Sequence, residues 1–434
     1  MKTQSAYADA VLSDISATEL LRICRDLAWS EMAVMPGVKS RLGPRLSAAK
    51  SSESLNWSPD GLALDSLARM QLATAASIWC NALDSGFEDL FLAKRNAADW
   101  ADVMQRARSA GACGFTFSTS GSTGKRRHIR HAEDTLTAEA QVWAQLLQAG
   151  VIPVRRVVLL VPCHHMYGFI WGVLLPRMLG VSVFDASHDA LPELAAGDLV
   201  VAVPDQWQWL ATSRQRRLQA APAGPVQVWP EGVQGVSSTA PMPASLHHQL
   251  VTSNAAEPAL LTRLLQIYGS TETGGVGWRD CPDQPYALAQ GRIRSASDGI
   301  ELQLPSGMHA QLALQDELQW TSSSDFHLLR RTDCAVQVGG HNVSAVWVVE
   351  QLLAHPAVQD ASVRLDTAAP LPRLKAFVVL KVPSDPTQQD SLEAWITHNL
   401  PWYANFSSIS YGIQIPCNSL GKHSDWPVQD RRLL

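Results

Sequence analysis

Short apolar runs that alternate with helical stretches are the strongest constraint on the fold of this chain. From about residue 111 the sequence contains the runs FTFSTSG, VVLLVP, GVSVFD, DLVVAVP, VQVWP and LLQIYGS, separated by glycine, proline and helical segments. Strands spaced in this way form a mostly parallel sheet with helices on both faces. Ligands of such sheets bind at the carboxyl ends of the strands, so we expect the chemistry in the loops that follow these runs.

The two ends of the chain follow different patterns. The first hundred residues predict helices: SATELLRICRDLAW begins with a capping serine, and DSLARMQLATAASIW carries Leu67, Met70, Thr74 and Ile78 at helical spacing. Near the end, VVEQLLAHPAV and SLEAWITHNL predict helices, and DASVRL, AFVVLKV and YGIQIP predict strands. We therefore predict an α/β fold in three parts: a helical N-terminal region (1–105), a large core of mixed, mostly parallel sheets and helices (106–332), and a small α+β domain (333–434).

Composition limits the class of protein. The 434 residues are enough for two or three structural units, and the net charge of -5 argues against a nucleic acid or an anionic membrane as partner. The start lacks a secretory signal, and no apolar run approaches the roughly 20 residues of a membrane span. The seven cysteines are scattered and form no CxxC pair, which favours a reducing compartment without a cysteine zinc site. We expect a cytoplasmic protein.

The loop TSGSTGKRR, residues 119–127, follows one of the predicted strands. Its two glycines free backbone amides, and its four hydroxyl side chains and three cations add donors, so the loop suits an anion such as phosphate. A kinase-type phosphate loop is excluded, because Thr119 stands where that pattern needs glycine and Arg126 where it needs serine or threonine. A polar surface turn is the alternative.

A second constellation lies in QIYGSTETGGVGWR, residues 266–279. An apolar strand ends there in an aromatic residue, followed by a glycine, hydroxyls and a carboxylate. Tyr268 can stack on a purine, Thr271 can bond an α-phosphate, and Glu272 can hold a Mg²⁺ ion that bridges phosphate oxygens.

These segments resemble motifs of the adenylate-forming superfamily, which includes acyl- and aryl-CoA synthetases and adenylation domains. TSGSTGKRR resembles its phosphate loop TSGSTGKPK, with Arg126 for proline and Arg127 for lysine. The second exchange keeps the charge and adds a planar fork suited to phosphate. The resemblance implies that the following residues of the loop contact the nucleotide: Thr119, Ser120, Gly121, Ser122, Thr123, Gly124 and Arg127.

Further motifs arrive in the family's order. In PCHHMYG the resemblance implies that His165 shields the acyl site and assists thioester formation. SSTAPMP is similar to the family's SGGAPLP turn, which implies that Thr239, Ala240 and Pro241 border the adenine, with Thr239 narrowing the acid pocket because glycine is usual there. YGSTE adds Tyr268, Gly269 and Ser270 to the nucleotide site and Thr271 and Glu272 to the catalytic residues.

The last third of the chain resembles the family's hinge and lid region. Asp316 is implied as the ribose ligand, Arg331 as a ribose or phosphate contact, and Asp333 as the hinge. Gly340 is implied in the thioester tunnel, and Lys422, in IPCNSLGKHSDW, as the catalytic lysine that reaches the carboxylate and the α-phosphate. Leu314, Gln315 and Arg330 depart from the usual Thr, Gly and Gly.

The resemblance implies an ATP- and Mg²⁺-dependent ligase. A carboxylic acid, with an aryl or short acyl acid favoured, would attack ATP to give an acyl-adenylate and pyrophosphate, and a thiol would then displace AMP while the small domain rotates as a lid. The thiol would belong to coenzyme A or to the phosphopantetheine of a carrier protein. A degenerate nucleotide-binding protein without catalysis is an alternative.

The N-terminal segment LNWSPDGLALDSLARMQ raises one more alternative, because it is similar to the heart of acyl carrier proteins, in which the serine of DSL carries phosphopantetheine. That serine is Ser66. The other interpretation is that Ser66 caps a helix whose residues Leu67, Met70 and Thr74 pack on the large domain.

Overall fold

A computed structural model describes most of the chain in two compact units. The described residues are 15–35, 55–58, 60–119, 127–187, 190–220, 229–252, 259–296, 299–304, 306–331, 335–338, 341–366, 369, 371–382, 385–416 and 425–428. Those up to Thr119 and from His128 to Leu329 form the first unit, and Arg127 and those from Arg330 onward belong to the second. The division into three parts at residues 105 and 332 stays a prediction.

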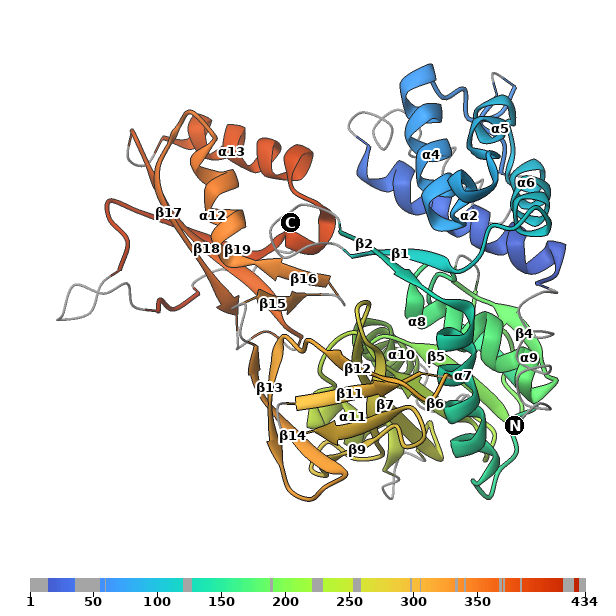
Figure 1. Cartoon of the computed structure of the whole chain (residues 1–434). Helices are drawn as coiled ribbons and strands as arrows, with labels where there is room; N and C mark the ends of the chain where they lie inside the picture. The colour runs from blue at the N-terminus through green and yellow to red at the C-terminus, as the bar shows by residue number, and fades with distance from the viewer. Residues whose placement is uncertain are drawn as a thin grey trace. The chain divides into compact units, whose positions relative to one another are not determined.

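The first unit begins with a group of helices that lie together (Figure 1). Ser16 caps the first of them through a capping box with Glu19, as the sequence predicts. The helices are α2 (Ala17–Val34), α4 (Ser66–Trp79), η1 (Ala82–Ser85), α5 (Glu88–Ala93) and α6 (Ala97–Ser109).

Helix α4 corrects two expectations. Its N-cap is Asp65, whose carboxylate accepts a hydrogen bond from the Ala68 amide at 2.9 Å, so Ser66 is the first helical residue and not the cap. Leu67 and Met70 are 66% and 52% exposed and Thr74 is also exposed, so the predicted packing face was wrong. The buried face carries Ala68, Leu72, Ala73, Ala76, Ser77 and Trp79. Its small residues let the helix approach its neighbours closely.

A nine-stranded sheet forms the centre of the first unit, in the order β13-β14-β9-β8-β7-β6-β5-β3-β4. The strands from β4 to β7 are parallel, and β8, β9 and β14 add antiparallel pairs. The bounds are β3 (Arg156–Leu159), β4 (Ser182–Asp185), β5 (Asp198–Ala202), β6 (Gln234–Ser237), β7 (Arg263–Ser270), β8 (Gly274–Arg279), β9 (Tyr286–Leu288), β13 (Asp316–Trp320) and β14 (Asp325–Arg331). The α/β fold with a large mixed sheet is confirmed, and its parallel part consists of β7, β6, β5, β3 and β4.

Helices and two smaller sheets complete the first unit. The helices are α7 (Glu133–Gln148), α8 (Met166–Phe169), the π-helix η2 (Ile170–Leu174), α9 (Leu175–Leu179), α10 (Pro204–Ala220) and α11 (Ala244–Val251). The smaller sheets are β1 (Phe115–Thr119) with β2 (Arg127–His131), and β10 (Ile293–Ala296), β11 (Gly299–Gln303) and β12 (His309–Leu312). One continuous apolar core joins the N-terminal helices to the sheet through residues such as Trp79, Phe115 and Phe169.

The second unit is a small α+β structure, as predicted. Helices α12 (Ala345–Leu353) and α13 (Pro386–Asn399) pack with a three-stranded sheet of β17 (Val358–Asp366), β18 (Arg373–Leu380) and β19 (Phe406–Gly412) (Figure 1). The hairpin β15 (Ala335–Val338) and β16 (His341–Ser344) and the short helix η3 (Trp402–Ala404) complete it. The end strand begins at Phe406, earlier than the predicted YGIQIP.

No helix in the described part of the chain is long and apolar enough to span a membrane.

Candidate active site

Three of the predicted motifs follow parallel strands of the large sheet. His165 follows β3, Thr239 follows β6, and Thr271 and Glu272 follow β7. Strands β3, β5, β6 and β7 run in the same direction with continuous register, so these loops lie at one edge of the sheet. This is the edge at which open α/β sheets bind ligands.

The loop after β3 places His165 just before α8. His165 is half-buried, and its ring lies 3.9 Å from that of the buried His164, centre to centre. The indole nitrogen of Trp79 donates to the carbonyl of His164 at 2.9 Å and holds the loop from the N-terminal helices. A Cβ on Gly168 would lie 2.1 Å from the carbonyl oxygen of Pro162, so the turn PCHHMYG closes only around a glycine.

The end of β6 and the loop after it carry three buried hydroxyls and a strained residue. The Ser238 hydroxyl donates to the carbonyl of Ile267 at 2.9 Å and ties this loop to β7. Thr239 has φ +74°, a left-handed backbone that β-branched residues rarely adopt. The side-chain oxygens of Ser237 and Thr239 are buried and have no hydrogen-bond partner among the described residues. They are therefore available to a ligand at this edge.

Tyr268 and Asp316 lie in direct contact although 48 positions separate them. The phenol of Tyr268, near the end of β7, donates to Oδ2 of Asp316, the first residue of β13, at 3.0 Å. The ring of Tyr268 is half-buried against Tyr286 and Phe326, with centroid distances of 5.8 and 5.7 Å. The structure thus brings together Tyr268 and Asp316, the residues predicted to contact the purine and the ribose.

The turn between β7 and β8 presents Thr271 and Glu272, which are both half-buried. The Thr273 hydroxyl accepts a hydrogen bond from the Ser270 amide at 3.1 Å, which closes the turn. Gly274 has φ +67°, and a Cβ on Gly269 would lie 2.1 Å from the Gly274 carbonyl oxygen. The turn therefore requires the glycines that the sequence supplies.

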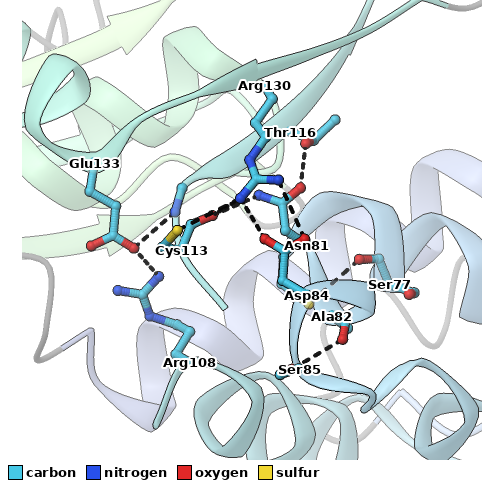
Figure 2. A network of polar contacts seen from close by, with 12 residues as sticks. Ser77, Asn81, Ala82, Asp84, Ser85, Arg108, Cys113, Thr116, Arg130 and Glu133 are labelled. Atoms are coloured by element: carbon cyan, nitrogen blue, oxygen red, sulfur yellow. Dashed lines mark hydrogen bonds and ion pairs between the residues drawn. The ribbon is translucent and has the colours of Figure 1, made fainter. Parts of the chain in front are cut away.

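The hairpin of β1 and β2 flanks the predicted phosphate loop and is anchored to the N-terminal helices (Figure 2). The Arg130 guanidinium pairs with Asp84 at 2.5 Å and donates to the carbonyl of Cys113 at 2.9 Å. Thr116 donates to the side-chain oxygen of Asn81 at 2.7 Å. The first turn of α7 is tied in by Glu133, which accepts from Arg108 at 2.7 Å and from the Gly114 amide at 3.1 Å.

Part of the predicted site falls outside the described residues. Thr119 is described, with its hydroxyl buried and without a hydrogen-bond partner among the described residues, and Arg127 is an exposed residue that begins β2. Arg331 ends β14. The residues that lie outside are Ser120, Gly121, Ser122, Thr123, Gly124, Asp333, Gly340 and Lys422. The assigned roles of all these residues, described or not, stay predictions.

The sequence analysis missed three side chains that hydrogen-bond the backbone of the turn between β7 and β8. His131, Glu139 and Arg292 hydrogen-bond its backbone from β2, from α7 and from the segment just before β10. A signal in the sequence was Glu139, the one charged residue among the buried residues of α7.

The described residues fit a bound nucleotide with Mg²⁺. Buried hydroxyls without a partner, at Thr119, Ser237 and Thr239, offer hydrogen bonds at the sheet edge and its adjoining hairpin. Mg²⁺ in nucleotide sites is held by one or two carboxylates together with phosphate oxygens, so the single carboxylate of Glu272 suits it.

Comparison with known proteins identifies the family. A profile of the AMP-binding enzymes matches residues 64–302. A 4-coumarate–CoA ligase of Halorhodospira halophila is 34% identical over 420 residues, 95% of this chain and 100% of the relative. A 3,4-dihydroxybenzoate–[aryl-carrier protein] ligase of Bacillus anthracis is 26% identical, over 70% of this chain and 71% of its own.

Solved structures show the same fold. The amide bond synthetase McbA of Marinactinospora thermotolerans matches with a TM-score of 0.52 and 19% identity, over 71% of this chain and 67% of its own. A malonyl-CoA ligase in complex with methylmalonyl-CoA and AMP matches with a TM-score of 0.52 and 20% identity, over 71% and 72%.

The chain therefore belongs to the family of AMP-binding enzymes. The prediction of an AMP-forming acid–thiol ligase, which activates a carboxylic acid with ATP and passes the acyl group to a thiol, is confirmed at this level.

Proposed function

We propose that this protein activates a hydroxylated aryl acid of the 4-coumarate type and transfers it to coenzyme A. The observation that carries the proposal is the match along almost the whole chain to relatives named 4-coumarate–CoA ligase. Three of them are 33–35% identical to this chain and cover 85–95% of it. The aryl-carrier protein ligase, although more distant, also acts on a hydroxylated aryl acid.

The residues at the sheet edge would divide the work of the first step. Tyr268 would stack on the adenine, and Asp316, fixed by the Tyr268 phenol at 3.0 Å, would accept hydrogen bonds from the ribose hydroxyls. Thr271 would donate to the α-phosphate, and Glu272 would hold Mg²⁺. When bound, that ion would neutralise charge on the phosphate oxygens.

The remaining residues would complete the two half-reactions. The loop 119–127 would bind the leaving pyrophosphate, and Lys422 would stabilise the negative charge shared by the acid and the α-phosphate. Arg331 would contact the ribose or phosphate. With Asp333 as a hinge, the second unit would then exchange Lys422 for Gly340 and open the thioester tunnel, with His165 at the acyl site.

Exchange of labelled pyrophosphate into ATP tests the first step. We expect exchange with 4-coumarate and related aryl acids and much weaker exchange with short aliphatic acids. Exchange supported only by aliphatic acids would contradict the aryl assignment. A coenzyme A thioester detected by mass spectrometry would support the acceptor.

A carrier-protein phosphopantetheine is the second candidate acceptor, favoured by the match to the aryl-carrier protein ligase. Acyl transfer to an added holo-carrier protein, with no thioester formed on free coenzyme A, would select it. The Ser66 interpretation makes a separate prediction, a phosphopantetheine increment on the intact mass of this chain. Ser66 itself is exposed, but the helix that it begins packs into the core of the first unit and lies within the matched family region, which favours a structural role for this segment.

A further inference from the structure

We propose that the buried ion pair of Glu139 and Arg292 positions the turn Thr271–Gly275 and thereby sets how tightly the enzyme uses Mg²⁺. The inference rests on the proposed function, because it assumes that Thr271 and Glu272 meet the phosphate and the metal. Glu139 and Arg292 act as positioning residues, since their contacts are with the backbone of the turn.

The two side chains of the ion pair make three hydrogen bonds to the backbone of the turn. Arg292 donates from Nη1 to the carbonyl of Gly275 at 2.5 Å and from Nη2 to the carbonyl of Thr273 at 2.6 Å. The Gly275 amide donates to Oε1 of Glu139 at 2.8 Å. Nη2 of Arg292 lies 3.2 Å from Oε2 of Glu139, which makes the two side chains an ion pair.

Both charged groups are almost completely shielded from water. The residues Arg292 and Glu139 are 1% and 3% exposed, and burial lowers the pKa of the Arg292 guanidinium. A buried ion pair seldom stabilises a fold more than well-packed apolar residues of similar size. We therefore attribute to Glu139 and Arg292 a role in positioning the turn, because three of their hydrogen bonds reach its backbone.

The packing leaves the turn little freedom to move. A Cβ on Gly274 would lie 2.1 Å from Oε2 of Glu139, and one on Gly275 would lie 2.5 Å from the ring of Trp143. The Trp143 indole also donates to Oε1 of Glu139, at 3.3 Å, and fixes the carboxylate from within α7.

A third side chain supports the turn from the phosphate-loop hairpin. Nε2 of His131 donates to the carbonyl of Thr271 at 2.7 Å. Because His131 is the last residue of β2, this bond links the strand that follows the predicted phosphate loop to the segment that presents Thr271 and Glu272. The His131 bond is thus a further contact that holds the backbone of the turn.

Arg292→Lys tests the inference, because lysine keeps the charge but cannot reach both carbonyls with a planar fork. Three quantities are measured on the full chain: hydrogen–deuterium exchange of the peptide covering 270–279, the Mg²⁺ concentration that gives half-maximal pyrophosphate exchange, and the affinity for AMP without metal. We expect the rate of deuterium exchange in this peptide and the half-maximal Mg²⁺ concentration each to rise about tenfold, which is the effect of losing one hydrogen bond from a charged donor. The affinity for AMP should stay within about twofold of that of the unaltered protein.

Arg156→Lys is the matched control. Arg156 makes a comparable two-point contact with the buried Asp198, at 2.9 and 2.6 Å, but at the amino ends of β3 and β5, the opposite edge of the same sheet. We expect it to change neither the deuterium exchange of the turn nor the Mg²⁺ requirement. An equal change in this control would overturn the positioning role.

A double variant, Glu139→Leu with Arg292→Met, keeps the test decisive if Arg292→Lys unfolds. Apolar residues of similar size maintain the core but remove the contacts to the turn. A normal Mg²⁺ requirement in a folded double variant would overturn the inference, whereas a raised one with unchanged AMP affinity would support it. Glu272→Gln separates the two claims. If Glu272→Gln leaves the Mg²⁺ requirement unchanged, the proposed role of the turn in binding the metal fails. If Glu272→Gln raises the requirement but the Arg292 variants leave it unchanged, only the positioning inference fails.

Discussion

Thr239 provides a prediction in which stability and function should move in opposite directions. Its backbone has φ +74°, and its hydroxyl is buried without a hydrogen-bond partner among the described residues. Both features cost free energy in the absence of a ligand. We expect Thr239→Gly to stabilise the free protein against unfolding and to weaken its discrimination among acids.

The magnitude follows from four contributions. A non-glycine residue held in the left-handed region costs about 1–3 kcal/mol, and glycine removes that strain. Loss of the unpaired hydroxyl removes a desolvation penalty of about 1–3 kcal/mol. Against these, glycine adds backbone freedom to the unfolded chain, which costs about 0.5–1 kcal/mol, and some packing of the half-buried side chain is lost. We expect a net gain of about 1–2 kcal/mol.

Urea unfolding of the ligand-free protein, followed by far-UV circular dichroism, measures the change as a shift of the midpoint. Ala240→Gly is the matched control, because the adjacent Ala240 does not have a positive φ, and there glycine should destabilise by about 0.5–1 kcal/mol. If Thr239→Gly lowers the midpoint as much as Ala240→Gly does, the argument from strain is refuted. In pyrophosphate exchange, the ratio of kcat/KM values for hydroxylated and unsubstituted aryl acids should fall in the Thr239 variant.

Three further predictions follow from the site and its charges. Lys422→Ala should abolish acid-dependent pyrophosphate exchange while AMP still binds; undiminished exchange would remove the proposed role of that lysine. Tyr268→Phe removes the bond to Asp316 and should raise the KM for ATP about tenfold with little effect on the KM for the acid, since a hydrogen bond to a charged acceptor contributes about 1.5–3 kcal/mol; an effect on the acid alone would contradict the nucleotide assignment. Burial lowers the pKa of His131 and of His247, so below about pH 6.5 the unfolded chain binds protons at these histidines more readily than the folded chain does. The stabilisation from the two neutral histidines should be fully present above that pH, and the free energy of unfolding should fall as the solution is acidified. Urea midpoints measured from pH 8 to pH 5 check this, and a midpoint that does not fall would contradict it.

The order of motifs was readable from the sequence because each motif depends on local chemistry. Strands that end in glycine and hydroxyl residues predict ligand loops, and the parallel register of β3, β6 and β7 brings those loops to one edge. The contact between Tyr268 and Asp316 agrees with their predicted places in one nucleotide site, although periodicity alone does not pair two residues so far apart.

Helix α4 shows where pattern reasoning failed. Leu67, Met70 and Thr74 have helical spacing, but so do Ala68, Leu72 and Ala76, and the chain buries the second set. Both faces carry apolar residues, so periodicity cannot choose between them. Tertiary packing decides which face is buried: the alanines and Trp79 of this helix lie in the same apolar core as the neighbouring helices and the sheet.

By itself, the amino-acid sequence determined the α/β class and the identity of the chemical groups at the strand ends, because these depend on residue type and short spacing. The reaction class came from the resemblance of its motifs to those of a known family. Only the tertiary structure decided which side chains support them. Glu139 and Arg292 lie more than a hundred positions apart, and their charges can be buried only because the fold brings them to each other and to the backbone of one turn. Such a pairing depends on long-range packing, which no local pattern encodes.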